Sequence, residues 1–154
     1  MSVWRFHKRI SELLGIALSD EITKKLDESM DLFGEDRDFY GRDRDRFIQF
    51  VSDFYRLYGT RNVVLYCMLY VFLDRFSKSL VSEFTEKCGE LGVKERVKRA
   101  YADALREVEE IFEKYPTDMR EFKSRIERNR DEVIDIMLNE GSKVYRGKGR
   151  ISST

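Results

Sequence analysis

The chain has 154 residues, 42% of them hydrophobic and 13% aromatic, and its 29 basic residues equal its 29 acidic residues in number. A chain of this length can form one domain with its own core, which excludes a disordered protein, a collagen-like protein and a disulfide scaffold. The longest uncharged apolar run covers residues 63–73, and a helix needs ~20 apolar residues to cross a bilayer. No apolar leader opens the chain, so we expect a cytoplasmic protein without a membrane partner.

Charged residues make up 38% of the chain, whereas amide side chains are few. This balance is typical of proteins from hyperthermophiles. Charge is also unevenly distributed, because four basic residues and no acidic residue follow Glu140. We therefore predict a mildly acidic domain over residues 1–141 and a basic, flexible C-terminal tail over residues 142–154.

Apolar residues recur at helical spacing in almost every segment. Short runs in which apolar and polar residues alternate, as in β-strands, are missing from the sequence. The sequence predicts an all-α fold, a single-domain bundle of about five to six helices. The first helix is predicted from Val3 to Leu18, and Ser19 is the predicted N-cap of a second helix that stops at Gly34. Residues 34–46 are highly charged and carry no apolar stripe, which predicts a charged loop or a short solvated turn.

The middle of the chain predicts three further helices. One runs from Phe47 to Tyr58 and ends at Gly59, which can adopt the left-handed conformation. The next runs from Arg61 to about Glu86, and its first half is apolar on every face. Such a helix has to be surrounded, so we expect it to be the central, fully apolar helix of the bundle. An amphipathic helix follows from Val93 to Tyr115.

The last predicted helix begins at Thr117, directly after Pro116 ends the preceding helix, and reaches Gly141. Its apolar stripe is narrow, close to a heptad repeat, and is interrupted by Asn129. A stripe of this kind supplies one seam and not a wide face. We therefore expect this helix to pack at the periphery or against another chain.

Five acidic residues form the pattern that most suggests metal chemistry: Glu109, Glu110, Glu113, Glu132 and Asp135. They resemble the EExxE and ExxD carboxylates with which the all-α nucleoside-triphosphate pyrophosphohydrolases, the MazG-like and dUTPase-like family, hold Mg²⁺. The resemblance implies a Mg²⁺-dependent pyrophosphohydrolase. However, a tight turn at Pro116 would displace Glu132 by roughly 15 Å from the position opposite Glu110, and one ion cannot bridge that gap. We therefore favour a chain without a catalytic residue, a metal or a cofactor.

The histidine and cysteine residues do not form the patterns of zinc sites or nucleophilic catalysis. His7 is the only histidine, so zinc sites with paired histidines and histidine-dependent triads lack partners. We expect His7 on the exposed side of the first helix, beside Lys8 and Arg9. Cys67 is expected to be a buried apolar residue and not a nucleophile. Cys67 and Cys88 should lie about 30 Å apart along one helix, which excludes a disulfide bond between them.

The predicted tail combines spaced cations with one aromatic ring: Lys143, Tyr145, Arg146, Lys148 and Arg150. Such a segment could neutralise a few phosphates and stack on one base. Short basic tails are also common in proteins that bind no nucleic acid. Binding of nucleic acid through these residues is therefore kept as an alternative function.

The segment from Phe47 to Phe72 consists of an aromatic helix, a break that contains Asn62 and a long apolar helix. This order resembles the small all-helical subunits of Cmr-type RNA-guided CRISPR effector complexes, although Val63 and Val64 follow Asn62 where those subunits have Gly and Leu. The resemblance implies a subunit that lines an RNA–DNA duplex in a larger assembly and cuts nothing.

Aromatic residues cover more than one face of the third predicted helix: Phe47, Phe50, Phe54, Tyr55 and Tyr58. Surplus aromatic surface often anchors a protein partner, although a bundle of this size could bury all of these rings. We expect a non-catalytic helical interaction protein, either a homo-oligomer or a small subunit of a larger assembly. The alternatives are a nucleic-acid-binding subunit that uses the tail and, after it, the Mg²⁺-dependent pyrophosphohydrolase.

Overall fold

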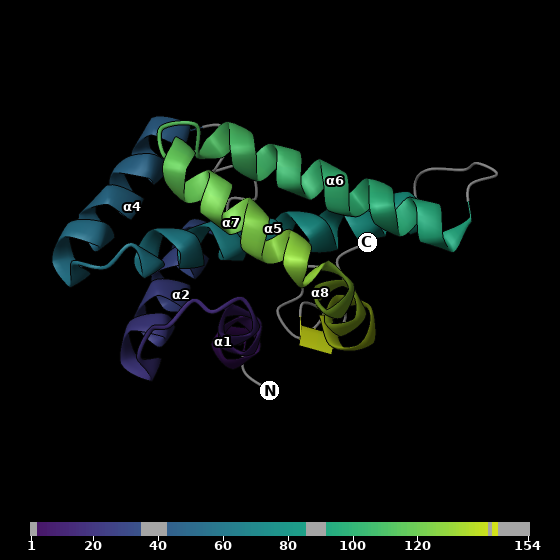
Figure 1. Cartoon of the computed structure of the whole chain (residues 1–154), viewed down its shortest axis with the longest axis horizontal. Coiled ribbons are helices and arrows are strands. Elements are labelled where there is room, and N and C mark those ends of the chain that lie inside the picture. Colours follow the sequence, from purple (N-terminus) through teal and green to yellow (C-terminus); the bar gives the residue numbers. More distant parts are fainter. Residues whose placement is uncertain (1–2, 35–42, 86–91, 142, 145–154) are drawn as a thin grey trace.

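The computed structural model describes residues 3–34, 43–85, 92–141 and 143–144. These residues form seven α-helices and one short π-helix, and no strand occurs among them (Figure 1). The predicted all-α class is therefore confirmed, but the described residues alone hold seven α-helices and not five to six. The helices are α1 (Val3–Leu13), α2 (Asp20–Gly34), α4 (Arg44–Tyr58), α5 (Asn62–Thr85), α6 (Val93–Ile111), α7 (Pro116–Arg128), α8 (Arg130–Ile136) and the π-helix η1 (Met137–Gly141).

The single helix predicted from Thr117 to Gly141 is divided into three. Asn129 leaves helical geometry, with φ of −112° and ψ of 18°, and its side-chain amide donates a hydrogen bond to the Arg125 carbonyl at 2.9 Å. Asparagine competes with the helix because its short side chain bonds to nearby backbone groups. α8 then begins at Arg130, and η1 follows from Met137. The prediction of one continuous helix is wrong at Asn129.

Pro116 is the first residue of α7 and not the residue that ends α6, which stops at Ile111. Proline suits the first position of a helix, because the N–H there has no acceptor within the helix. Tyr115 consequently occupies the N-cap position, and Thr117, the predicted start of the last helix, lies inside α7.

Two local signals in the sequence are confirmed. The Ser19 hydroxyl accepts a hydrogen bond from the Ile22 N–H at 3.2 Å and so caps α2. Gly59 ends α4 with φ of 68°, and its N–H donates to the Tyr55 carbonyl at 2.8 Å. α1 is shorter than predicted, because Gly15 turns the chain with φ of 73°.

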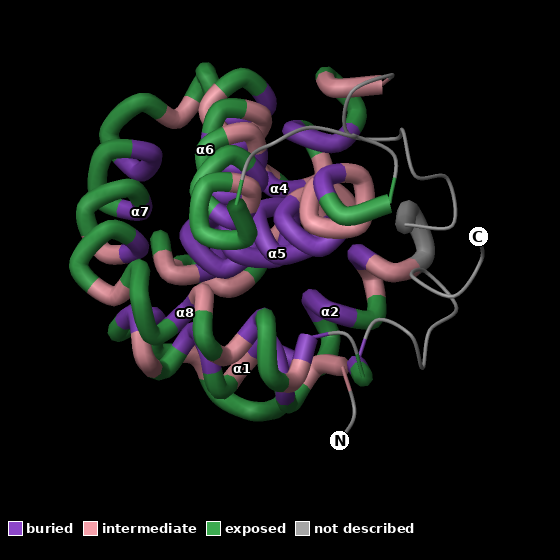
Figure 2. Tube along the Cα trace, turned by 90° about the vertical axis from the view of Figure 1, so that its right-hand side faces the viewer, coloured by how far each residue is buried: buried purple, intermediate pink, exposed green. Residues whose placement is uncertain are grey.

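The first half of α5 lies at the centre of the core. Each residue from Val63 to Leu73 exposes 3% or less of its surface, and α5 contacts α1, α2, α4, α6 and α7. Figure 2 shows this buried run enclosed by other helices. α5 is not apolar along its whole length, since Asp74, Ser77 and Glu83 are buried polar residues further along it. No described helix is long and apolar enough to span a membrane.

α6 lies along α5, and α7 packs on α5 as well (Figure 1). Aromatic rings join the three helices: the Phe72 ring centroid lies 5.4 Å from that of Tyr101 on α6 and 6.2 Å from that of Phe122 on α7. The core also includes Val144, which is 8% exposed. The packing therefore includes a residue of the predicted tail, residues 142–154.

His7 is buried, with 1% of its surface exposed, so the prediction of an exposed His7 is wrong. Its Nδ1 lies 2.5 Å from Asp27 Oδ1 on α2. The Tyr66 hydroxyl of α5 donates to the same carboxylate oxygen at 2.9 Å. The carboxylate is the hydrogen-bond partner of the His7 ring and the Tyr66 hydroxyl, two polar groups that are costly to bury without a partner. The three side chains thereby connect α1, α2 and α5.

We predict that Asp27→Ala destabilises the fold strongly. The substitution removes the carboxylate that the His7 ring and the Tyr66 hydroxyl share, at a cost of about 1–3 kcal/mol for each buried group. Glu28→Ala is the matched control, because Glu28 is an exposed neighbour on α2 with only a 4.0 Å contact to Lys24. Urea denaturation should give a much lower midpoint for Asp27→Ala. Equal midpoints for the two variants would contradict this role of Asp27.

Candidate functional site

An apolar strip runs along one side of α4. Phe50, Phe54 and Tyr58 follow one another at helical spacing, with ring centroids 4.7 Å apart for the first pair and 5.8 Å for the second. These three side chains are half-buried, whereas Leu57, on the same side of the helix, is 69% exposed. We call Phe50, Phe54, Leu57 and Tyr58 the aromatic edge.

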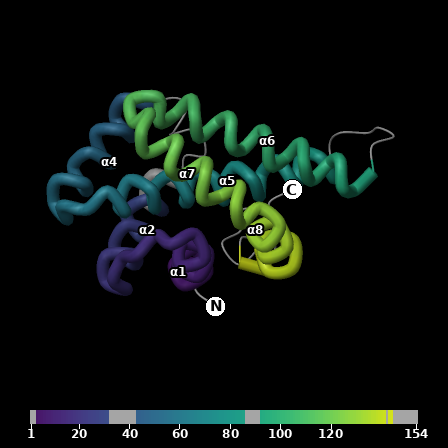
Figure 3. Tube along the Cα trace, viewed as in Figure 1, coloured from purple at the N-terminus to yellow at the C-terminus, as the bar shows by residue number. Residues whose placement is uncertain are grey.

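The inner face of α4 explains why the aromatic edge lies at the border of the core, where its three aromatic side chains pack against the core from the side and Leu57 is exposed. Phe47, Ile48 and Val51 are buried on that face, and the Phe47 ring meets Phe112 edge to face at 5.8 Å. α4 packs on α5 and lies at the outer end of the fold (Figure 3). Since the buried face already fills the core, the remaining apolar residues of α4 lie at its border with solvent.

Polar residues lie beside the aromatic edge on the solvent side of α4. Asp53 accepts hydrogen bonds from Gln49 Nε2 and from Arg56 Nη2, each at 2.9 Å. The edge therefore has a polar border, as the contact surfaces of interaction proteins usually have.

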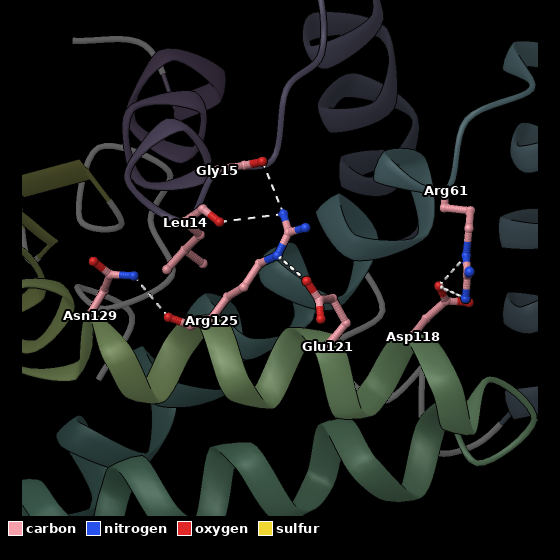
Figure 4. Close-up of polar contacts among 7 residues, drawn as sticks. All are labelled: Leu14, Gly15, Arg61, Asp118, Glu121, Arg125 and Asn129. Carbon is pink, nitrogen blue, oxygen red and sulfur yellow. Dashed lines mark hydrogen bonds and ion pairs between the residues drawn. The ribbon is translucent and has the colours of Figure 1, made fainter.

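A second candidate site is a cleft of about 530 Å³ between the start of α5 and the first ten residues of α7. Figure 4 shows Arg61 pointing toward Asp118 and Arg125 toward Glu121 across this region. The Arg61 Nε and Nη2 atoms lie 2.8 and 2.7 Å from Asp118 Oδ1. We call it the arginine cleft, and its lining residues are Arg61, Asn62, Leu65, Thr117, Asp118, Arg120, Glu121 and Arg125.

Arg125, which lines the arginine cleft, hydrogen-bonds to the turn after α1. Its Nε donates to Glu121 Oε1 at 2.8 Å, and its Nη1 donates to the carbonyls of Gly15 at 2.9 Å and Leu14 at 3.5 Å (Figure 4). The last carbonyls of a helix lack partners within it, so a guanidinium is well suited to this position. The cleft wall is therefore fixed by contacts between distant parts of the chain.

Four of the five acidic residues of the predicted Mg²⁺ site lie on two helices, Glu109 and Glu110 on α6 and Glu132 and Asp135 on α8. Glu113 lies in the turn after α6. Glu109 forms an ion pair with Lys123 Nζ at 3.2 Å. Glu109 and Glu113 line one surface hollow, whereas Glu132 lines another. Within residues 3–34, 43–85, 92–141 and 143–144, no group of three or more histidine, cysteine, aspartate or glutamate side chains could hold a metal ion.

Of the predicted nucleic-acid-binding residues, only Lys143 lies within the described part of the chain, where it is exposed. Tyr145, Arg146, Lys148 and Arg150 lie outside the described residues. The arginine cleft was not predicted, because it combines segments more than fifty residues apart in sequence.

Among the residues that the structure describes, two titratable side chains have strongly raised pKa values. Burial raises the pKa of the Cys67 thiol to about 12, so the thiol is protonated and shielded at neutral pH. Burial also raises the pKa of Tyr101 to about 12, with a further increase from the charge of Glu127 and a decrease from Arg130. Both groups are therefore unsuited to act as nucleophiles.

Comparison with protein-family models, with curated proteins and with solved structures finds no match to this chain. The fold and the two candidate sites define an all-α protein with a partly exposed aromatic edge and an arginine-lined cleft. Its function is therefore inferred from these surfaces.

We predict that Cys67 does not react with a water-soluble thiol reagent while the protein is folded. The variant Cys88→Ser isolates this thiol, and release of the chromophore from an aromatic disulfide reagent measures its reactivity. Denaturant should expose the thiol and allow one equivalent to react, because burial both shields it and raises its pKa. Reaction of the folded variant as fast as that of free glutathione would contradict the burial of Cys67.

Proposed function

We propose that this chain is a non-catalytic helical interaction protein, and that the aromatic edge of α4 binds a second copy of the chain. The observation that carries the proposal is the 69% exposure of Leu57 beside half-buried aromatic rings. Burial of such a strip against a partner removes apolar area from water, at about 25 cal/mol per Å². Aromatic residues are also the most common anchors of protein interfaces.

The rigidity of α4 favours binding through this edge. The Ser52 hydroxyl lies 2.5 Å from the Tyr115 hydroxyl, and the buried face of α4 is part of the core. The rings of Phe50, Phe54 and Tyr58 contact one another, so they have little rotamer freedom left to lose. A surface that is ordered before binding loses less entropy on association.

The environments of the reactive side chains support a non-catalytic protein. Cys67 is buried and protonated, and His7 is buried in contact with Asp27. Glu109, which the pyrophosphohydrolase alternative requires as a ligand, is paired with Lys123. In each case a potential catalytic group already has a structural partner or is shielded from solvent.

The role of a small subunit in a larger assembly is an alternative that would use the same edge. A Cmr-like subunit would belong to this group. The nucleic-acid alternative uses the predicted tail residues, of which Lys143 is exposed and the other four lie outside the described residues. We rank self-association first because it needs no partner other than the chain itself and uses the exposed Leu57 of the aromatic edge.

We predict that Leu57→Glu weakens self-association at least tenfold, because it places a charge inside an apolar contact. Ala102→Glu is the matched control, since it adds the same charge at an exposed position on another helix, α6. Sedimentation equilibrium over a hundredfold range of concentration measures the association constants, and circular dichroism checks that both variants fold. A wild-type chain that stays monomeric throughout, or equal constants for both variants, would contradict self-association through the aromatic edge.

A further inference from the structure

We propose that the arginine cleft binds a phosphate group. The cleft lies on α7 and the turn before α5, and the aromatic edge lies on α4, so the two surfaces use different residues. This inference does not depend on self-association. It assigns a ligand of defined chemistry to the polar cleft beside α7.

The cleft carries one more positive than negative charge. Its three cations are Arg61, Arg120 and Arg125, and its two carboxylates are Asp118 and Glu121. The carboxylates pair with Arg61 and Arg125. Arg120 is exposed, and its one contact among the described residues is a 3.5 Å approach of Nη2 to the Thr117 hydroxyl. The positive charge of Arg120 is therefore available to an anion.

The two paired guanidiniums also keep donors for a ligand. Arg61 contacts Asp118 through Nε and Nη2 only, and its side chain is 56% exposed. A guanidinium has five N–H donors in a planar fork, so the Nη1 donors of Arg61 remain for a ligand. Asp118 is itself 7% exposed, and it holds the Arg61 fork in place.

The first turn of α7 adds to the positive potential of the cleft. No side chain caps this helix end, where Tyr115 is the N-cap residue and Pro116 follows. Pro116 has no N–H and the Met119 N–H donates to the Tyr115 carbonyl, so the Thr117 and Asp118 N–H groups are the ones without an acceptor within the helix. The helix dipole favours negative charge at this end. Thr117, which lines the cleft, supplies a hydroxyl donor at the same end.

The walls of the cleft are fixed without a ligand. Asn62 Nδ2 donates to the Ala17 carbonyl at 2.9 Å, which joins the start of α5 to the turn before α2. Arg125 bonds to the Gly15 carbonyl on the same turn, and Arg61 bonds to Asp118. Because these contacts order Arg61 and Arg125 in advance, only the Arg120 side chain has to be ordered when an anion binds.

A phosphate fits these donors better than a carboxylate does. Arginine forks bind both anions, but a carboxylate offers two oxygens, whereas a phosphate offers more and can carry a second charge. The donors of Arg61, Arg120 and Thr117 surround the cleft from two segments of the chain. An anion with several acceptor oxygens can bridge these segments, as phosphate does at other arginine sites.

The test is an NMR titration of the full-length protein, which follows the Arg Nε–H signals and the amide signals of Thr117 and Asp118. The probes are inorganic phosphate, a short unphosphorylated single-stranded oligonucleotide and an acidic peptide, all at one ionic strength. We expect saturable shifts at the cleft with a phosphate-containing probe. Arg120→Gln should weaken that binding about tenfold, because it removes a charge-assisted hydrogen bond.

Arg128→Gln is the matched control, because Arg128 is an exposed arginine on α7 that does not line the cleft; its affinity should stay within twofold of wild type. Saturation by inorganic phosphate alone identifies a free phosphate as the ligand, and saturation by the oligonucleotide identifies a nucleic-acid backbone; both results support the proposal. The proposal would be overturned if no probe gave a saturable shift, or if both variants lost affinity equally. It would also be overturned if the acidic peptide bound as tightly as phosphate. The titration is repeated with Leu57→Glu, which weakens self-association only. Unchanged phosphate binding by this variant would show that the two proposals stand or fail separately.

Discussion

The fold depends on one constraint, which is that the run from Val63 to Leu73 must be covered on every side. A helix that is apolar all round is stable in water only when neighbours surround it, and α5 contacts α1, α2, α4, α6 and α7. Tyr66 and Tyr70 bring hydroxyl groups into this apolar surface. Both donate to carboxylates of α2, Tyr66 to Asp27 and Tyr70 to the aspartate one turn further on, so the burial of α5 also determines where α2 lies.

The same constraint places the two candidate sites at the border of the molecule. α4 and α7 each use one face to cover α5, and their remaining residues form the aromatic edge and one wall of the arginine cleft. The α1–α2 turn lies against α7 through Arg125, which completes the cleft. Both proposed sites therefore lie on the solvent-facing sides of helices that cover α5, and neither lies on the buried part of α5 itself.

Local signals predicted much of the fold, because they depend on neighbours in sequence. Gly59 and Ser19 end and begin helices as expected, and the apolar run of α5 predicted its burial. The break at Asn129 had a visible signal, since this polar residue interrupts the stripe, but its cause is a side-chain bond to the backbone. His7 was misplaced because its partner, Asp27, lies twenty residues away on another helix. The arginine cleft had no signal in any one segment, since Arg61 and Asp118 are 57 residues apart.

Amide hydrogen exchange at α5 tests the central claim most directly. If every helix depends on covering Val63 to Leu73, the amides of this run should exchange only when the whole molecule unfolds, and their opening free energy should equal that from urea denaturation. Exchange of these amides through a local opening, faster than that of the buried amides of α6, would show that the fold does not depend on α5.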